Sequence, residues 1–340
     1  MAKKRKELNK HQWGFAQVWN KTLEDSEPRE YKKRDRIWAS ELGNAPVDVW
    51  MKMQGNIPSN PPNPRSLRKF EAGNIWEWLA ELILRRAGIL QDKQEWVEFQ
   101  FEGLLPVTGK LDFLAGGIPN YDKAENSLME MGLPDIFLRA GKNIVKQLKE
   151  KYPNGLESRV LEIKSSSTFI FDRIERTGHP LRNHSLQLFH YLKAKDMERG
   201  AVVYICRDDC RMFESLVSNP SAVGDDYKNT IEMLTKYHRS GERPPLEEPI
   251  EFDAEEGKFS KNWGIEYSGY LTELYGFKKP KDYYDKFSPL VSGWNRVLTR
   301  IEKGQKMTDN NKEKLIEMKE YGFDIAKIKE LKEQFKAKLK

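Results

Sequence analysis

The sequence predicts an α/β (α+β) protein in which helices flank a central mixed β-sheet, with further helices toward both ends of the chain. Residues 95–114 alternate apolar and polar side chains with a period of two, which is typical of half-buried strands. Short apolar runs at 159–164 and 201–206 indicate buried strands. Helical patterns at 134–152 and 185–198 lie between these strands, so strands and helices alternate along the chain.

Composition limits the kind of protein. The 340 residues suffice for a large core and for one or two domains. With 58 Lys and Arg against 52 Asp and Glu, the net charge of +6 suits a local basic groove better than a uniformly basic nucleic-acid coat. The sequence has no run of about 18 apolar residues, so we expect no membrane span. Residues 1–6 are basic but no apolar segment follows them, which is unlike a secretory signal.

Residues 1–65 are expected to form an N-terminal helical region. Four large apolar residues have the spacing of a short amphipathic helix: Trp13, Phe15, Val18 and Trp19. Residues 37–43 suggest a second helix start, with Ser40 as its N-cap. A proline-rich connector at 58–64 ends the region.

A long helix is predicted from Ser66 to about Ala87, with Gly88 as its C-cap. Its centre, residues 75–84, is apolar nearly all round, which predicts a buried helix. Gly73 lies one turn before Glu77 and suggests a close approach by another backbone.

The expected core domain spans residues 66–243. Within it, residues 95–114 predict a hairpin and residues 168–184 an irregular basic segment, while a further strand is expected at 211–217 and a helix at 225–238. Residues 244–304 form an aromatic-rich extension that begins with a proline-rich linker. Residues 305–340 form a lysine-rich helical tail, for which a solvated helix is the ordinary interpretation.

The most informative stretch is the strand that contains Glu162 and Lys164. Because side chains alternate along a strand, these two polar groups share one face, and Leu161 and Ile163 share the other. An acid and a base at the polar end of an apolar strand build a poor core but suit a metal ion beside an activated water. Asp112, on a neighbouring strand, supplies a second carboxylate.

Read together, Asp112 and the Glu-x-Lys triplet of Glu162 and Lys164 resemble the PD-(D/E)XK nuclease superfamily. Gln187 and Tyr191 on the next helix form a Gln-x-x-x-Tyr motif that is similar to the RecB-like exonuclease branch. Residues 70–77 resemble that branch's first motif, with Glu77 where many members have a histidine. The resemblance covers residues 66–217 and implies a restriction-endonuclease-like core.

The chemistry explains why such residues occur together. Phosphodiester hydrolysis needs a water that is nucleophilic at neutral pH and a stabilised anionic transition state, and Mg²⁺ or Mn²⁺ supplies both. Asp112 and Glu162 are the expected metal ligands, with the backbone carbonyl of Ile163 and the Glu77 carboxylate as further oxygens. Lys164 is expected to orient the hydroxide and offset phosphate charge. The position of the ligand on the first helix stays open, since Glu71 or Glu81 would also fit.

Four polar residues are expected to line the groove or support it: Gln187, Tyr191, His184 and Ser165. Gln187 and Tyr191 share a helix face, on which they contact either the DNA backbone or the region of Lys164. For His184 alone, a place on a half-buried amphipathic helix is the simpler interpretation. Ser165 either donates to phosphate or lies in a solvated loop.

Cys206 and Cys210 indicate a reducing compartment, and two thiols cannot form a four-cysteine zinc or iron–sulfur site within one chain. Many relatives of the resembled family bind such a cluster through a late cysteine-rich segment. The matching segment here, residues 263–270, has no cysteine, so we expect no iron–sulfur cluster and aromatic packing in its place. We expect Cys206 to be a buried thiol and Cys210 a turn residue.

The resemblance implies a DNA exonuclease of phage or mobile-element recombination, repair or processing. Its substrate would be double- or single-stranded DNA, a recombination or replication protein its partner, and the cytoplasm of a bacterial or phage-infected cell its location. A structure- or sequence-directed endonuclease on the same fold and a non-catalytic nucleic-acid-binding module stay open as alternatives. The sequence leaves the oligomeric state undecided.

Overall fold

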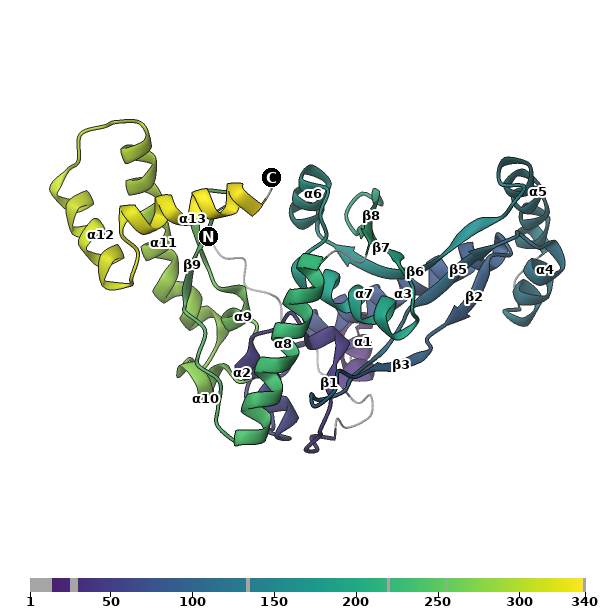
Figure 1. Ribbon diagram of the computed structural model, residues 1–340, viewed down its shortest axis with the longest axis horizontal. Coiled ribbons are helices and arrows are strands. Elements are labelled where there is room, and N and C mark those ends of the chain that lie inside the picture. The colour runs from purple at the N-terminus through teal and green to yellow at the C-terminus, as the bar shows by residue number, and fades with distance from the viewer. Residues whose placement is uncertain (1–13, 25–29, 133–134, 219–220, 255, 339–340) are drawn as a thin grey trace. The chain divides into compact units, whose positions relative to one another are not determined.

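The computed structural model describes residues 14–24, 30–132, 135–218, 221–254 and 256–338, which form two compact units (Figure 1). The first unit consists of Met1–Asn44, Lys52–Asn56 and Pro62–Glu242, and the second of Ala45–Met51, Ile57–Pro61 and Arg243–Lys340. The basic residues 1–6 and Trp13 lie outside the described residues. No helix among the described residues combines the length and the apolar character that a membrane span needs.

A five-stranded mixed sheet forms the centre of the first unit, as the sequence predicts. Its strands are, in spatial order, β2 (Leu90–Lys93), β5 (Phe113–Gly117), β6 (Leu156–Ser166), β7 (Arg199–Cys206) and β8 (Met212–Ser218). The middle strand β6 runs parallel to β7 and antiparallel to β5, and the remaining pairs are antiparallel. The two apolar runs of the sequence therefore form β6 and β7, two inner strands that each have a neighbouring strand on both sides.

A small second sheet of the first unit orders its strands as β1 (Ile37–Trp38), β4 (Val107–Lys110) and β3 (Trp96–Phe99). The antiparallel pair of β3 and β4 confirms the predicted hairpin. The predicted helix start at 37–43 is wrong, because Ile37 and Trp38 pair with β4 before a short 3₁₀-helix at Ala39–Glu41. Ser40 lies inside that turn and caps no helix.

The long helix α3 spans Pro64–Arg86, close to the predicted bounds, and the Asn63 side chain accepts from the Ser66 N–H at its start. The expected burial is wrong: of its residues only Leu82 is buried, and several apolar side chains are largely exposed, namely Phe70, Ile75, Trp78 and Ile83. The helix packs on α1 (Phe15–Glu24), α4 (Tyr121–Glu130), α5 (Asp135–Lys151) and the sheet, and these neighbours cover only part of its circumference.

Three more helices complete the first unit: α6 (Thr168–Thr177), α7 (Arg182–Ala194) and α8 (Ser221–Ser240). The prediction of an irregular segment at 168–184 is wrong for α6, which buries Phe171 and Ile174 and ends at Gly178 in a left-handed conformation. Helix α7 packs on β6 and β7 and is buried along most of its length. Figure 1 shows α6 at the end of β6 opposite to α4 and α5.

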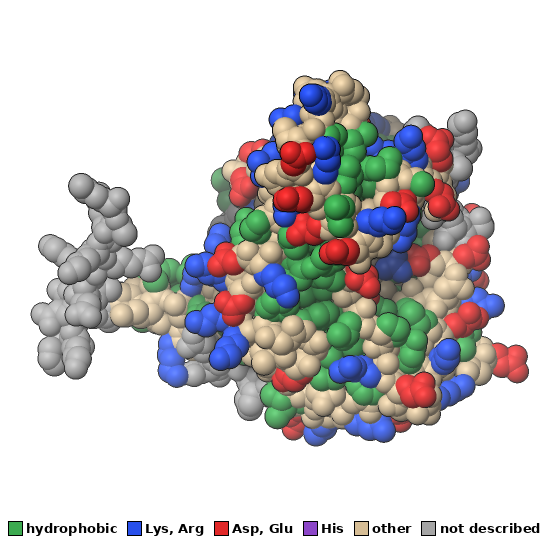
Figure 2. Space-filling model, turned by 90° about the vertical axis from the view of Figure 1, so that its left-hand side faces the viewer, with side chains coloured by type: hydrophobic (Ala, Val, Ile, Leu, Met, Phe, Trp, Pro, Cys, Tyr) green, Lys and Arg blue, Asp and Glu red, His purple; other side chains and the backbone are tan. Residues whose placement is uncertain are grey.

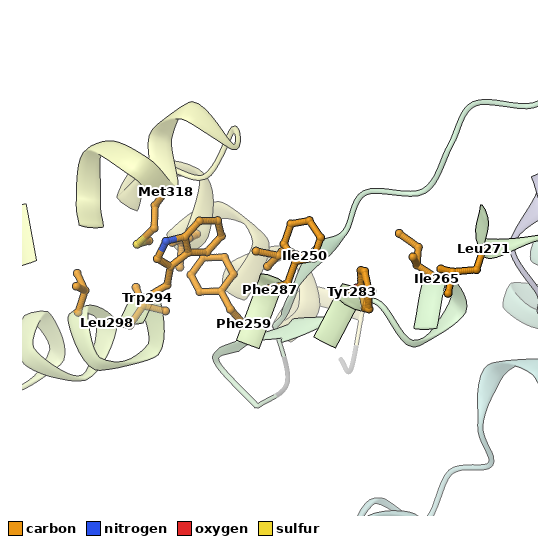
Figure 3. Close-up of a cluster of buried hydrophobic side chains, with 11 residues drawn as sticks. Ile250, Phe259, Ile265, Leu271, Tyr283, Phe287, Trp294, Leu298 and Met318 are labelled. Atoms are coloured by element: carbon orange, nitrogen blue, oxygen red, sulfur yellow. The ribbon is translucent and has the colours of Figure 1, made fainter. Parts of the chain in front are cut away.

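The second unit has a core of its own, which Figure 3 shows. A two-stranded antiparallel sheet, β9 (Ile250–Asp253) and β10 (Lys258–Lys261), packs against α11 (Pro280–Glu302), and the Phe259 ring lies 5.1 Å from that of Trp294. The short helices α9 (Trp263–Glu266) and α10 (Leu271–Tyr275) follow β10. The helix α2 (Pro46–Met53) contributes the buried Val47 to a smaller cluster around Tyr270.

Two expectations for the second unit need correction. The lysine-rich tail forms α12 (Asp309–Glu320) and α13 (Ile325–Lys338), which bury Met318 and Ile328 in the core and so are more than a solvated extension. In the segment 263–270, Tyr270 packs inward, but Trp263 and Tyr267 stack on each other at the surface, 54% and 65% exposed.

Figure 2 shows basic and acidic side chains interspersed with hydrophobic ones over the face that it draws.

Candidate active site

Asp112 and Glu162 come together across the β5–β6 pair. The register pairs Phe113 with Leu161, so one further step sets Asp112 opposite Glu162. Asp112 itself precedes β5, in the two-residue link from β4, whereas the sequence suggested a place on a strand. Its Oδ2 accepts a hydrogen bond of 2.8 Å from the Ile163 N–H, which fixes the carboxylate against the edge of β6.

Glu162 and Lys164 form an ion pair on the same face of β6. Glu162 is 1% exposed, and Lys164 Nζ contacts its Oε1, whereas Oε2 is buried and has no hydrogen-bond partner among the described residues. A buried carboxylate oxygen without a partner is costly, because it has lost its hydration without compensation. This oxygen is therefore the place in the site where an additional positive group would be most stabilising.

The charges of this site act on one another. Burial raises the pKa of Asp112 well above its ordinary value, and repulsion by Glu162 adds to the effect. Burial likewise raises the pKa of Glu162, against the attraction of Lys164. Burial alone would lower the pKa of Lys164, but the attraction of Glu162 and Asp112 outweighs it, so the pKa is raised and the ammonium stays protonated.

Glu77 of α3 belongs to the same electrostatic cluster. Burial raises its pKa, and the largest charge effect after burial is repulsion by Glu162. Glu81, one turn on, instead pairs with Arg85 at 2.7 Å and Lys93 at 2.6 Å. Their hydrogen bonds outweigh burial and lower the pKa of Glu81. Of these two glutamates, Glu77 is thus the one that shares the electrostatic environment of Glu162 and has no cation paired with it among the described residues.

Gln94 connects two of the acidic residues and was not anticipated from the sequence. Its side-chain amide donates to the Glu77 carboxylate, and its backbone N–H donates to the Asp112 carbonyl at 3.1 Å. Gln94 has a φ of 51°, so it holds this position in a left-handed conformation that is uncommon for a residue with a side chain. A lone glutamine after β2 offers no sequence signal that would have revealed this role.

Gln187 and Tyr191 lie behind the cluster and are both buried. Gln187 Nε2 donates to Tyr191 Oη at 3.0 Å, and Tyr191 Oη donates to the Lys110 carbonyl at 3.0 Å, two residues before Asp112. Gly109 makes this contact feasible, because a Cβ there would lie 2.7 Å from both Tyr191 Cε1 and Ala39 Cβ. The motif thus supports the link that contains Asp112.

His184 and Ser165 occupy the borders of the site. His184 Nδ1 lies 2.8 Å from Tyr204 Oη, and Tyr204 is the partner of Lys164 in the β6–β7 register. Burial lowers the pKa of His184 to about 3, and the charge of Lys164 acts in the same direction, so the ring is neutral. Ser165 is half-buried on β6 beside α3: a Cβ on Gly73 would lie 3.9 Å from its Oγ. The expected close backbone approach at Gly73 is therefore wrong.

The oxygen donors of this site fit a hard divalent cation. Among the described residues, no three His, Cys, Asp or Glu side chains already converge into a ready-made metal site. The carboxylates of Asp112 and Glu162 nevertheless lie opposite each other, and Glu162 Oε2 has no hydrogen-bond partner among the described residues. Burial raises the pKa of both carboxylates, and repulsion by Glu162 adds to the effect at Asp112. The Ile163 carbonyl points to the side of β6 on which Asp112 lies, because the N–H and C=O of one strand residue point to the same neighbour and the Ile163 N–H donates to Asp112.

Cys206 and Cys210 belong to β7 and the turn after it, whereas the acidic residues and Lys164 come from α3, from β6 and from the link before β5. Cys206 ends β7 and is buried, and Cys210 is exposed in the following turn with a φ of 61°.

No family model matches the chain, and no curated protein matches it either. Among solved structures, the crystal structure of SSO0001 is similar with a TM-score of 0.39 and 19% identity, over 65% of this chain and 87% of that one. LHK-Exo in complex with dAMP has a TM-score of 0.37 and 10% identity, over 66% and 93%. The alkaline exonuclease LHK-Exo from Laribacter hongkongensis has a TM-score of 0.32 and 12% identity, over 61% and 89%. These are distant likenesses, so a functional assignment depends on the side chains of the site.

Proposed function

We propose that this protein is a metal-dependent nuclease of the PD-(D/E)XK superfamily, with a restriction-endonuclease-like core, that hydrolyses phosphodiester bonds in DNA. The observation that supports it most is the buried Glu162 carboxylate, which has Lys164 on one oxygen, no partner on the other among the described residues, and Asp112 opposite it across the strand pair. A core without a function would replace these groups by apolar side chains, because burying them costs free energy.

Asp112, Glu162 and Glu77 would hold Mg²⁺ or Mn²⁺, together with the Ile163 carbonyl. Such a cation, when bound, lowers the pKa of a coordinated water and offsets negative charge on phosphate. Lys164 is protonated and 25% exposed, so its ammonium can donate hydrogen bonds to the attacking oxygen or to a phosphate oxygen. Gln94, Gln187 and Tyr191 act as positioning residues, since their hydrogen bonds end on Glu77 and on the link before Asp112.

The finer assignment is a RecB-like exonuclease in the recombination, repair or processing of phage or mobile-element DNA. The Gln187–Tyr191 pair on α7 supports this branch, because it contacts the link that contains Asp112. This function would place the chain in the cytoplasm of a bacterial or phage-infected cell, with a recombination or replication protein as its partner. With thiols only at Cys206 and Cys210, the absence of an iron–sulfur cluster stays a prediction.

The test is hydrolysis of DNA by the purified chain. Linear duplexes labelled at either end, and closed circles of the same sequence, are incubated with Mg²⁺, with Mn²⁺ or with EDTA. We expect metal-dependent release of nucleotides from the linear DNA and little loss of the circles. Rapid cleavage of circles would make the enzyme an endonuclease, and no cleavage with either metal would contradict the proposal.

Lys164→Met is the informative variant in that assay, because methionine keeps much of the length of the side chain and removes its charge. If Lys164 acts at the attacking oxygen, the cleavage rate falls far more than the affinity for DNA. Equal losses of rate and affinity would make Lys164 an ordinary phosphate contact.

A further inference from the structure

Two phenylalanine rings are exposed at one end of the strand β6. Phe70 of α3 is 55% exposed and Phe169 of α6 is 72% exposed. Phe171, only two residues after Phe169, is completely buried, so α6 already has an apolar face for the core and Phe169 is outside it. A single exposed apolar ring is ordinary at a protein surface, but exposed rings that gather at one place mark a binding site, which makes these two rings together a candidate for binding a ligand.

The direction of α3 places both rings at the same end of β6. Gly73 of α3 lies beside Ser165 of β6. Glu77, one turn later, accepts from the Gln94 side chain, whose backbone N–H donates to the Asp112 carbonyl, and Asp112 in turn accepts from the Ile163 N–H. The later part of the helix thus lies beside the earlier part of the strand, so α3 runs antiparallel to β6. Phe70 lies three residues before Gly73, about 4.5 Å further in the same direction. Beyond Ser165, β6 ends at Ser166, and Phe169 is the second residue of α6. The two rings therefore come from different elements to the exit of the strand that contains Glu162 and Lys164.

Positive charge accompanies Phe70. Arg65 and Lys69 are on the same helix with their side chains at least partly exposed, and its first turn contains no acidic residue. Arg65 is the second residue of α3, where a cation is unfavourable for the helix itself, so helix stability does not account for it. Side chains of this kind contact phosphate and sugar along a nucleic-acid strand.

A phenyl ring has no hydrogen-bonding group, so it recognises a base through its face. The faces of bases inside a duplex are covered by their neighbours, and only an unpaired or terminal base offers a free one. Phe70 precedes Glu77 by seven residues, or about 10.5 Å of helix, which is roughly three base steps of about 3.4 Å. A base stacked on Phe70 would thus lie a few nucleotides from a phosphate at the carboxylates.

We propose that Phe70 and Phe169 form a stacking subsite for the unpaired bases of a single-stranded DNA end. Because only an unpaired base can stack on the rings, the subsite selects a DNA strand that reaches the acidic cluster without its complementary strand. This inference rests on the proposed nuclease function, because it assigns the substrate of that same site.

The test is binding of an oligodeoxythymidylate with one 2-aminopurine near its end, in EDTA so that no cleavage occurs. Stacking on an aromatic ring quenches 2-aminopurine, and the wild type should quench it. Stacking contributes about 1–3 kcal/mol per base, so Phe70→Ala and Phe169→Ala should each weaken binding by about 5- to 150-fold. Phe70→Trp should restore binding and quenching.

Tyr152→Ala is the matched control, since Tyr152 is 38% exposed and lies just before β6 at its other end, so this variant should bind like the wild type. Unchanged affinity and quenching in both phenylalanine-to-alanine variants would overturn the inference, as would a failure of the wild type to bind. A parallel digestion with Mg²⁺ separates the two proposals. If the wild type cleaves DNA and the alanine variants bind normally, the nuclease stands and the subsite falls. If the wild type binds and quenches through the two rings but does not cleave DNA, the subsite stands and the nuclease proposal falls.

Discussion

Glu77 and Glu81 are one turn apart on α3, yet they face different charges. Glu81 is neutralised by Arg85 and Lys93, whereas Glu77 contacts the amide of Gln94 and lies in the field of Glu162. A carboxylate that already has two cations near it gains little from a third positive group. A carboxylate whose pKa is raised by burial and repulsion is stabilised much more by such a group.

We therefore expect Glu77→Gln to raise the Mg²⁺ concentration for half-maximal cleavage by at least about tenfold. Glu81→Gln should leave the metal requirement unchanged and cost roughly 1 kcal/mol of stability or less through its ion pairs. Glu71→Gln should change neither. Metal titrations of the three variants decide the matter, and a large effect at Glu71 or Glu81 alone would assign the wrong glutamate to the cation.

The acidic residues could be predicted from the sequence because strand alternation and residue type are local signals. Asp112, Glu162 and Lys164 are neighbours for this reason. Gln94 could not be predicted, because its role depends on a left-handed conformation between β2 and β3 that brings its side chain to Glu77 of α3. The missing partner of Glu162 Oε2 among the described residues is also a property of three-dimensional packing alone.

Two glycines near the site have opposite roles. A side chain at Gly109 would collide with Tyr191 and Ala39, so this glycine lets α7 lie against β4. For Gly73 the one neighbour within 4 Å of the position that a Cβ would take, among the described residues outside the backbone of its own helix, is the Ser165 hydroxyl, at an ordinary contact distance. Inside a helix, such a glycine mainly costs conformational entropy.

Gly109→Ala should lower the free energy of unfolding by about 1–3 kcal/mol, because the methyl group overpacks a buried contact. Gly73→Ala should raise it by about 0.5–1 kcal/mol. Denaturant titrations at one temperature measure both changes. A stable Gly109→Ala protein that keeps the Tyr191–Lys110 hydrogen bond would show that this glycine is dispensable.

A buried histidine of α7 is expected to make the free energy of unfolding depend on pH. His190 is completely buried with its Nδ1 3.0 Å from Tyr227 Oη, and burial lowers its pKa to about 4. In the unfolded chain the ring binds a proton near pH 6.5, so stability falls as the pH drops from about 6.5 to about 4. At pH 5 the loss relative to pH 7 is about 2 kcal/mol.

His190→Gln removes this titration and keeps a polar group toward Tyr227. The difference in unfolding free energy between pH 7 and pH 5 should therefore shrink by about 2 kcal/mol in the variant. An unchanged difference would mean that the ring is already protonated in the folded protein or that other groups cause the acid sensitivity.

Elements with a strong periodic signal could be predicted, and elements set by long-range pairing could not. The strands β6 and β7 and the hairpin of β3 and β4 follow from apolar runs and alternation. The strand β1 exists because Ile37 pairs with Val107, which is distant in the sequence, and a local pattern cannot show this. For α3 the apolar residues were visible but their exposure was not, since it depends on which helices cover it.

At the scale of the whole molecule, the chain contains two separate cores. The carboxylates, Lys164 and their supporting residues all belong to the first unit, whereas the cluster around Trp294 belongs to the second. Lysine-rich composition suggested a solvated tail, but Met318 and Ile328 pack inward from two successive helices. Composition thus predicted the charge of the C-terminal helices and not their place in a core.

The central claim is that Asp112 and Glu162 hold a divalent cation for phosphodiester hydrolysis, and calorimetric titration with Mn²⁺ tests it most directly. Asp112→Asn is the sharpest variant, because an amide oxygen can still accept from the Ile163 N–H, so the fold should persist. Asp122→Asn, an exposed acid at the start of α4, is the control.

The wild type and the Asp122→Asn protein should bind Mn²⁺ and cleave linear DNA. Asp112→Asn should lose most of the affinity, with a dissociation constant at least about tenfold higher, and should show no measurable cleavage at an unchanged melting temperature. If Asp112→Asn binds Mn²⁺ and cleaves DNA as the wild type does, these carboxylates are not the metal site.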